Sequence, residues 1–204
     1  PGELIFGADS HTCSYGALGA FGTGVGCTDL LYGMVTGKSW VLVPETVKFN
    51  LVGKLPEGVY ARDLILTIIG TIGANGCNYQ VMEFTGEGAK TLSISERMVL
   101  CNMAVEAGAK TGIFEPDEKA IEYLEAHGRK PKALFTSDPD AVYAREYTFD
   151  LSKIRPVVAK PDFVDNLVPA EEVRGVKIDE AFLGSCNNGR IEDLRVGASI
   201  LKGR

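Results

Sequence analysis

Apolar residues along this chain recur at two spacings, one typical of strands and one typical of helices. Strands are predicted over residues 4–6, 41–44, 47–52, 79–84, 147–151 and 180–183. Helices are predicted, from apolar residues three or four positions apart and from helix start and stop residues, over 60–72, 97–107, 116–127 and 191–201. Because strands and helices alternate throughout the chain, we expect a layered α/β fold.

Two of these elements carry clear local signals. The strand over 47–52 alternates apolar and polar residues, which predicts that one of its faces is buried. Before the helix over 97–107, Ser93 and Glu96 fit the S-x-x-E capping box, and Gly108 is a typical stop residue.

Small residues are dense between positions 16 and 34. Gly22, Gly24 and Gly26 give G-x-G-x-G, but Cys27 stands where the third glycine of a dinucleotide-binding fingerprint belongs. No β-α-β context precedes the glycines either. We therefore expect them to allow close packing of the backbone rather than nucleotide binding.

Three polar residues with side chains suited to chemistry follow the first predicted strand. In an extended chain Asp9 and His11 would point to one side and Ser10 to the other. A serine hydrolase is disfavoured, because Ser10 and His11 would face apart and the chain lacks a G-x-S-x-G elbow. The triplet predicts either an acid–base or ligand-binding site or a purely structural turn.

Cys186 lies in a polar turn between an apolar stretch and the helix predicted over 191–201. Near the N-terminal end of a helix, backbone N–H groups and the helix dipole favour a thiolate, which nucleophiles and metal sites require. The alternative is a small apolar residue that fills space beneath a turn.

Glu83 is a carboxylate within an otherwise apolar predicted strand. Such a residue either faces solvent or belongs to a site in which its charge is partnered. The sequence leaves both interpretations open.

Composition narrows the classes of function. The net charge of −6, without a cluster of lysine and arginine, argues against nucleic-acid binding, and the longest apolar run is too short for a membrane span. Five cysteines without C-x-x-C spacing favour free thiols in a reducing, cytoplasmic environment. Because Pro1 is not a start methionine and a helical pattern still runs near Arg204, we expect a fragment of a longer protein.

Three motifs resemble one family. They are Gly-Ala-Asp-Ser-His-Thr at 7–12, Met-Glu-Phe-Thr-Gly at 82–86 and Gly-Ser-Cys-Asn-Asn-Gly-Arg-Ile-Glu-Asp-Leu at 184–194. Together they resemble the aconitase superfamily, and within it the large subunits of the 3-isopropylmalate dehydratase and homoaconitase group. The resemblance covers essentially the whole chain and implies three-layer α/β/α domains, present in part.

The resemblance also implies a chemistry. These hydro-lyases move a hydroxyl group between neighbouring carbons by dehydration and rehydration, as in the conversion of 2-isopropylmalate to 3-isopropylmalate in leucine biosynthesis. A [4Fe-4S] cluster assists, because a Lewis-acidic iron and a proton donor stabilise the leaving hydroxide. In the two-subunit enzymes, the catalytic base and the loop that selects the substrate lie on a separate small subunit.

By resemblance, the motif residues receive individual roles. Asp9 and His11 would be acid–base and orienting groups, Ser10 a contact to a substrate carboxylate, and Glu83 a group hydrogen-bonded at the open iron. Cys186 would be the first cluster ligand. The polar residues around that ligand would be Asn188, Arg190 and Asp193.

The chain departs from the family pattern in two respects. Asn187 stands where the family usually has threonine, and the paired cysteines that complete the cluster lie, in the family, beyond the Gly-Ser-Cys turn. The other four cysteines, Cys13, Cys27, Cys77 and Cys101, match no ligand position. We therefore expect this chain alone to hold an incomplete set of cluster ligands and to be inactive.

The expected domain division follows from the resemblance. Residues 1–44 would complete one α/β domain, 45–147 would form a second, and 148–204 would begin a third that carries the ligand cysteine. Three alternatives remain: a homoaconitase or other hydroxy-acid hydro-lyase, a cluster-free binding module with the same fold, and a thiol enzyme that uses Cys186 with His11.

Overall fold

The computed structural model describes residues 1–203, and Arg204, the last residue of the third predicted domain, lies outside them. The strands are β1 (Leu4–Gly7), β2 (Phe21–Gly24), β3 (Thr46–Val52), β4 (Val81–Thr85), β5 (Thr111–Phe114), β6 (Arg145–Asp150), β7 (Val157–Ala159) and β8 (Leu167–Pro169). The α-helices are α1 (Cys27–Thr36), α2 (Ala61–Ile72), α3 (Glu87–Thr91), α4 (Ile94–Asn102), α5 (Glu118–Ala126) and α6 (Ile191–Leu201). Four 3₁₀ helices complete the set: η1 (Ser10–Leu18), η2 (Met103–Ala107), η3 (Leu151–Lys153) and η4 (Ala170–Val173).

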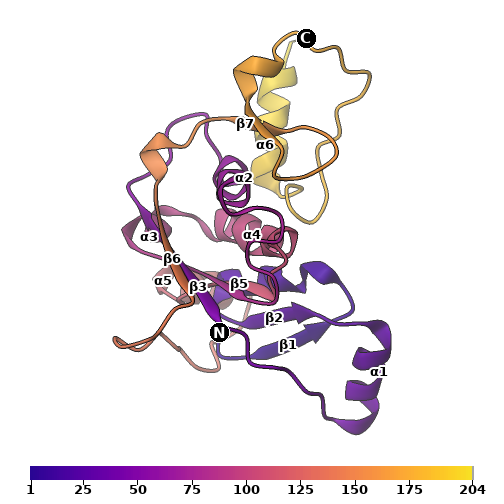
Figure 1. The fold of residues 1–204 in the computed structure, drawn as a ribbon, viewed down its shortest axis with the longest axis vertical. Helices are drawn as coiled ribbons and strands as arrows, with labels where there is room; N and C mark the ends of the chain where they lie inside the picture. Colours follow the sequence, from indigo (N-terminus) through magenta and orange to yellow (C-terminus); the bar gives the residue numbers. More distant parts are fainter. Residues whose placement is uncertain (204) are drawn as a thin grey trace.

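The centre of the molecule is a four-stranded sheet in the order β5-β4-β3-β6, in which every neighbouring pair is parallel. The sheet lies between helices, which confirms the predicted α/β class (Figure 1). Smaller sheets pair β1 with β2 in parallel and β7 with β8 antiparallel. Within residues 1–203, no helix combines the length and apolar character that crossing a bilayer requires.

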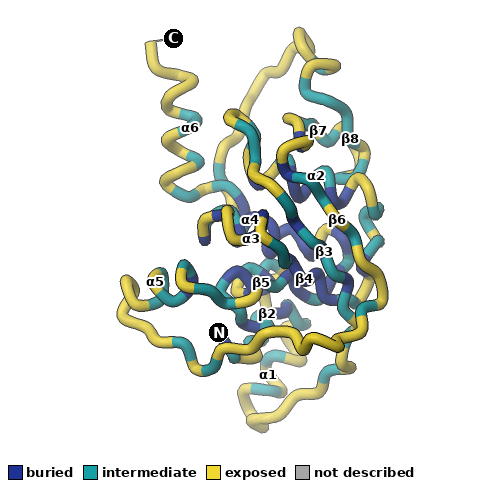
Figure 2. Tube along the Cα trace, turned by 90° about the vertical axis from the view of Figure 1, so that its left-hand side faces the viewer, coloured by how far each residue is buried: buried dark blue, intermediate teal, exposed yellow. Residues whose placement is uncertain are grey.

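The two faces of the central sheet differ in character. Val47, Phe49 and Leu51 on β3 are fully buried, as their alternation predicts. Phe49 stacks on Tyr147 with ring centroids 5.5 Å apart, and the aromatic layer continues across β4 to β5. This layer and the apolar residues of α2 and α4 form one hydrophobic core, which lies at the centre of the molecule (Figure 2). The residues that alternate with this layer along the strands include Lys48 and Glu83, which are register partners on the opposite face.

Most of the predicted elements are confirmed, within a few residues at their ends. The capping box at Ser93 and Glu96 forms with both hydrogen bonds, and α2, α5 and α6 occupy the predicted stretches. The helix predicted over 97–107 begins earlier, at Ile94, and continues as η2 to the left-handed stop residue Gly108.

Two predicted strands are wrong. Residues 41–44 and 180–183 have no regular structure, although both stretches are apolar. Val43 is 86% exposed and Phe182 is 82% exposed, and neither stretch is paired with a strand in any of the three sheets. Because a strand needs a partner for its backbone N–H and C=O groups, apolar side chains alone did not make these stretches strands.

The boundary predicted at residue 147 falls inside β6. That strand pairs with β3 from Arg145 to Asp150, so the sheet of the second predicted domain extends three residues beyond the boundary. The division of the chain into three domains stays a prediction.

The glycine-rich stretch packs closely against the sheet, as predicted, and Gly16 shows this most clearly. A Cβ atom on Gly16 would lie 1.7 Å from the carbonyl oxygen of Gly112 in β5. The clash is with backbone, which cannot rotate away. The glycine at position 16 therefore sets the distance between η1 and the sheet.

Replacing Gly16 with alanine is expected to destabilise the protein by about 1–3 kcal/mol or more, the cost of overpacking a close contact. Urea unfolding would measure the change in the free energy of unfolding. Gly33→Ala on α1 is the matched control, because its nearest neighbouring atom is 3.8 Å away. Equal stability of the two variants would contradict the prediction.

Candidate active site

The Asp-Ser-His triplet lies at the start of η1, where it forms a capped turn rather than an extended chain. Asp9 is the N-cap, and its Oδ1 accepts a hydrogen bond of 2.6 Å from the backbone N–H of His11. The same oxygen lies 3.4 Å from His11 Nδ1. Ser10 Oγ is 3.2 Å from this nitrogen, so the expectation that Ser10 and His11 face apart is wrong. In the turn that starts η1 these two side chains approach each other, whereas successive side chains of a strand point to opposite faces.

A second carboxylate approaches the other side of the histidine ring. Glu106 on η2 places Oε1 3.9 Å from His11 Nε2. The imidazole therefore lies between Asp9 and Glu106, with 29% of its side chain exposed to solvent. Glu106 was missed in the sequence, although a lone carboxylate in the apolar stretch 103–107 is a signal that could have found it.

The cysteine turn docks onto the same helical layer. Asn187, which is only 4% exposed, donates from Nδ2 to Asn102 Oδ1 at 3.0 Å and to the carbonyl oxygen of Val99 at 3.2 Å. Asn102 in turn donates to Ser14 Oγ on η1 at 2.9 Å. A buried chain of hydrogen bonds thus connects the turn beside Cys186 to the element that carries His11.

Arg62, at the start of α2, reaches the turn from another side. Its guanidinium donates to Asn187 Oδ1 and, at 3.3 Å, to Asn188 Oδ1. Partial burial lowers the pKa of the Arg62 guanidinium, and the carboxylates of Glu106 and Asp63 act in the opposite direction. Arg62 and Asn102 were also missed in the sequence, because nothing local connects either residue to Cys186.

Within the turn, the remaining predicted residues support its shape. Arg190 donates to the carbonyl oxygen of Asn187 at 2.8 Å, and Asp193 accepts from the Arg190 backbone N–H at 3.1 Å. Asn188 donates to Asp193 Oδ1 at 3.0 Å. Cys186 itself is exposed, so its thiol is accessible.

The other cysteines near this region are poor candidates for chemistry. Burial raises the pKa of the Cys13 thiol to about 12 and keeps that of Cys101 well above its ordinary value. Cys13 donates instead to the carbonyl oxygen of Asn102 at 3.3 Å. Both residues therefore remain protonated thiols near neutral pH.

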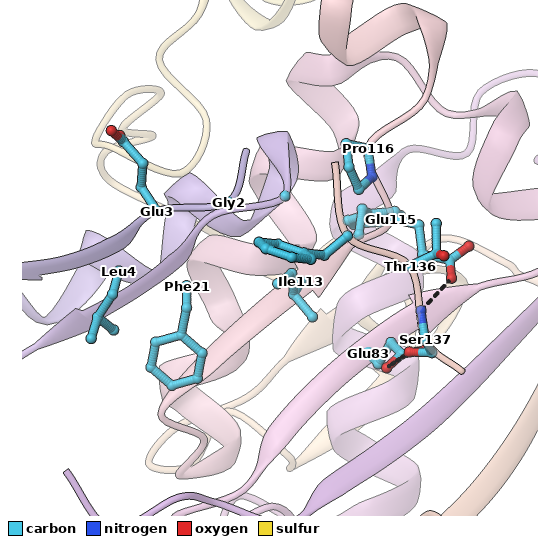
Figure 3. A pocket seen from close by; sticks show the side chains of 13 residues that line it. Gly2, Glu3, Leu4, Phe21, Glu83, Ile113, Glu115, Pro116, Thr136 and Ser137 are labelled. Atoms are coloured by element: carbon cyan, nitrogen blue, oxygen red, sulfur yellow. Dashed lines mark hydrogen bonds between the residues drawn. The ribbon is translucent and has the colours of Figure 1, made fainter. Parts of the chain in front are cut away.

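Glu83 makes its polar contacts elsewhere, on the sheet. It is 8% exposed, and its two oxygens accept from Ser137 Oγ at 2.9 Å and from the Tyr143 hydroxyl at 3.0 Å. The solvent-facing interpretation is therefore wrong. Glu83 lines a cavity of about 370 Å³, in which Ser137 also donates its backbone N–H to Glu115 (Figure 3).

The donors of the described chain do not fit a complete iron–sulfur cluster, which is held mainly by cysteine thiolates. Within residues 1–203, no three His, Cys, Asp or Glu side chains converge in a way that could hold a metal ion. Cys186 supplies one accessible thiol, and the neighbouring Asn187 and Asn188 direct their side chains to Arg62 and Asp193.

Comparison with known proteins agrees with the motifs. The Aconitase family (aconitate hydratase) model matches residues 1–174. The large subunit of 3-isopropylmalate dehydratase from Hydrogenobaculum sp. is 54% identical over the whole chain, which covers 48% of that relative. The corresponding large subunit 1 proteins of Methanopyrus kandleri and Pyrococcus furiosus are 52% and 53% identical over the whole chain, which covers 49% of each.

The chain spans about half the length of the curated relatives that it matches. Members of the matched family generally carry an iron–sulfur cluster. The match extends from the first residue through all of the central sheet, including β6. Because the family model covers most of the residues and the relatives align along the entire sequence, the chain belongs to the aconitase family.

Proposed function

We propose that the chain is part of the large subunit of a hydro-lyase that converts 2-isopropylmalate to 3-isopropylmalate by dehydration and rehydration. The observation that carries the proposal is the hydrogen-bonded docking of the Cys186 turn against Asn102, which connects it to the element bearing His11. Relatives with the large-subunit name of this enzyme match the whole chain, which supports the choice of substrate.

In this proposal each residue of the candidate site has a separate role. His11 transfers a proton to or from the substrate, and Asp9 and Glu106, on either side of its ring, orient it. Ser10, at the exposed start of η1, donates to a substrate carboxylate. Glu83 is the third proposed catalytic group, and it would act from the sheet through the cavity that it lines.

Cys186 is proposed as one ligand of a [4Fe-4S] cluster, with the remaining ligands supplied by polypeptide outside these 204 residues. A small subunit is the proposed partner, since the names of the relatives imply one. The 204-residue chain alone would then be inactive. The proposed division into three domains places Cys186 in the third.

Replacing Cys186 with alanine in the full-length large subunit is expected to lower bound iron and the visible cluster absorption at least several-fold after anaerobic reconstitution. The loss follows because one of few thiolate ligands is removed. Cys27→Ala is the matched control, since Cys27 is also exposed but lies on α1. Assays with the small subunit would compare 2-isopropylmalate, homocitrate and citrate.

Turnover of 2-isopropylmalate by the control variant, but not by Cys186→Ala, supports the proposal. A preference for homocitrate would contradict the proposed substrate but support the proposed class of reaction. If the natural-length protein binds no iron under reconstitution, the hydro-lyase proposal fails and the cluster-free binding module takes its place.

A further inference from the structure

The turn that presents Cys186 contains a strained residue. Ser185 adopts φ +74°, a left-handed conformation that is uncommon for residues other than glycine. Such conformations persist only when surrounding contacts hold them. Because Cys186 follows directly, the direction of its side chain depends on whatever holds the turn.

Two arginines hold this turn from different elements. Arg190, within the same segment, binds the carbonyl oxygens of Asn187 at 2.8 Å and Cys186 at 3.5 Å. Arg62 comes from α2, and one of its nitrogens donates to the side-chain oxygens of both Asn187 and Asn188. Of the two arginines, only Arg62 connects the turn to another element of the core, because it extends from α2, whereas the bonds of Asn187 to Asn102 and Val99 connect the turn to α4.

The end of α2 from which Arg62 extends is itself fixed. The neighbouring Asp63 accepts hydrogen bonds from the backbone N–H groups of Tyr60 at 2.9 Å and Val157 at 3.0 Å. The apolar side of α2 is buried in the core, including Leu64, Ile65 and Ile68. The backbone from which the Arg62 side chain extends is therefore fixed relative to the sheet.

Water cannot easily take the place of Arg62 as the hydrogen-bond donor to Asn187, because the Asn187 side chain is buried. Its two N–H groups are occupied by Asn102 and Val99, and its oxygen accepts from Arg62. The side chain is nearly inaccessible to solvent, so loss of Arg62 leaves a buried oxygen without its charged donor.

We propose that Arg62 is a positioning residue that clamps the Cys186 turn onto α2 through Asn187 and Asn188. The contacts of the clamp do not depend on the proposed function. Only the claim that the clamp positions a cluster ligand, Cys186, rests on that function. It accounts for the asparagine at position 187, whose amide can bond to Arg62 and Asn102 at once, whereas a threonine hydroxyl has one donor and a shorter reach.

The direct test is hydrogen–deuterium exchange of the backbone amides in the 204-residue chain. Arg62→Met is expected to accelerate exchange in residues 184–190 by about tenfold, as for the loss of a hydrogen bond from a charged donor. Arg62→Lys should recover part of the protection, because an ammonium can donate to one of the two asparagines. Arg129→Met is the control, since the Arg129 side chain makes no hydrogen bond or ion pair among residues 1–203.

A double-mutant cycle with Asn187→Ala tests the coupling. If the clamp exists, Arg62→Met adds little exchange once Asn187 is absent. Additive effects, an unchanged rate in Arg62→Met, or equal acceleration in α4 would each overturn the clamp, the last because it indicates general destabilisation.

A second measurement separates the clamp from the proposed function. In the full-length large subunit, Arg62→Met should lower the iron retained through anaerobic gel filtration several-fold relative to Arg129→Met. Retention equal to that of the control would overturn the proposal that the clamp serves the cluster. If the unaltered protein binds no iron while the exchange result holds, the clamp stands and the hydro-lyase proposal fails.

Discussion

If the proposed function is correct, replacing His11 with asparagine in the proposed two-subunit enzyme is expected to lower kcat by about 10²–10⁴-fold, the contribution typical of a positioned acid–base group. Asparagine keeps a polar side chain at the start of η1 but cannot carry the proton. Asp9 and Glu106 lie on either side of the imidazole, so the variant removes the ring that lies near both carboxylates.

The matched control is the only other histidine in the chain, His127 at the end of α5. Its Nδ1 lies 2.7 Å from the carbonyl oxygen of Tyr123, and its ring lies tilted against that tyrosine, with centroids 4.4 Å apart, at an exposed helix end. Steady-state kinetics of His127→Asn should match those of the unaltered enzyme. A kcat for His11→Asn within a few-fold of the control would refute the acid–base role.

A second large effect is expected at the ion pair between α4 and α5. Arg97 is 1% exposed, and its two terminal nitrogens donate to the carboxylate of Asp117 at 2.8 and 2.5 Å. Its Nε has no partner among the described residues, so Asp117 is the main group that compensates this buried charge. Asp117→Ala should cost about 3–5 kcal/mol in the free energy of unfolding, because it leaves a charge buried and unpaired.

Two further variants separate the causes of this loss. Asp117 also caps α5 by accepting from the Ala120 backbone N–H, and Asp117→Asn keeps an acceptor there while removing the charge. The double variant Arg97→Met with Asp117→Leu should recover most of the stability, because no charge remains to be paired. A loss below about 1 kcal/mol in Asp117→Ala, measured by urea unfolding, would mean that water solvates Arg97.

The same pair sets a direction for pH dependence. Burial alone would raise the pKa of Asp117, but the Arg97 guanidinium outweighs burial and holds the pKa below its ordinary value. A depressed pKa means that the pair stabilises the protein fully above the unfolded value of about 3.9. This stability is lost as the pH falls below that value and through the folded pKa, and the Asp117→Asn variant should lack this part of the acid sensitivity.

The sequence predicted well whatever depends on neighbours a few positions away. The capping box at Ser93, the alternation in β3 and the helix over 191–201 are local patterns, and the structure confirms each. Relations across the chain were not predictable in this way. Arg62 and Asn187 are 125 positions apart, and the partners of Glu83 lie 54 and 60 positions away.

The errors in the candidate site have the same origin. The sequence predicts an extended Asp-Ser-His triplet after the first strand, but the Asp9 side chain accepts a hydrogen bond from the His11 N–H and starts η1 instead. Glu106 could not be assigned to the site from the sequence, because it approaches His11 only when η2 packs against η1. Local signals thus identified residues whose side chains are suited to catalysis or binding. The packing of distant elements determined which of these residues lie in contact.

The order of strands in the central sheet has a consequence for the route by which the chain folds. β3, β4 and β5 follow one another both in sequence and across the sheet. β6 pairs with the other edge of β3, although β4 and β5 lie between β3 and β6 in the sequence. During synthesis that edge has no partner until residues 145–150 have emerged. Closing so long an interval slows folding, and an open edge can pair with another chain meanwhile. Conditions that delay the arrival of β6 should therefore favour misassembly through β3.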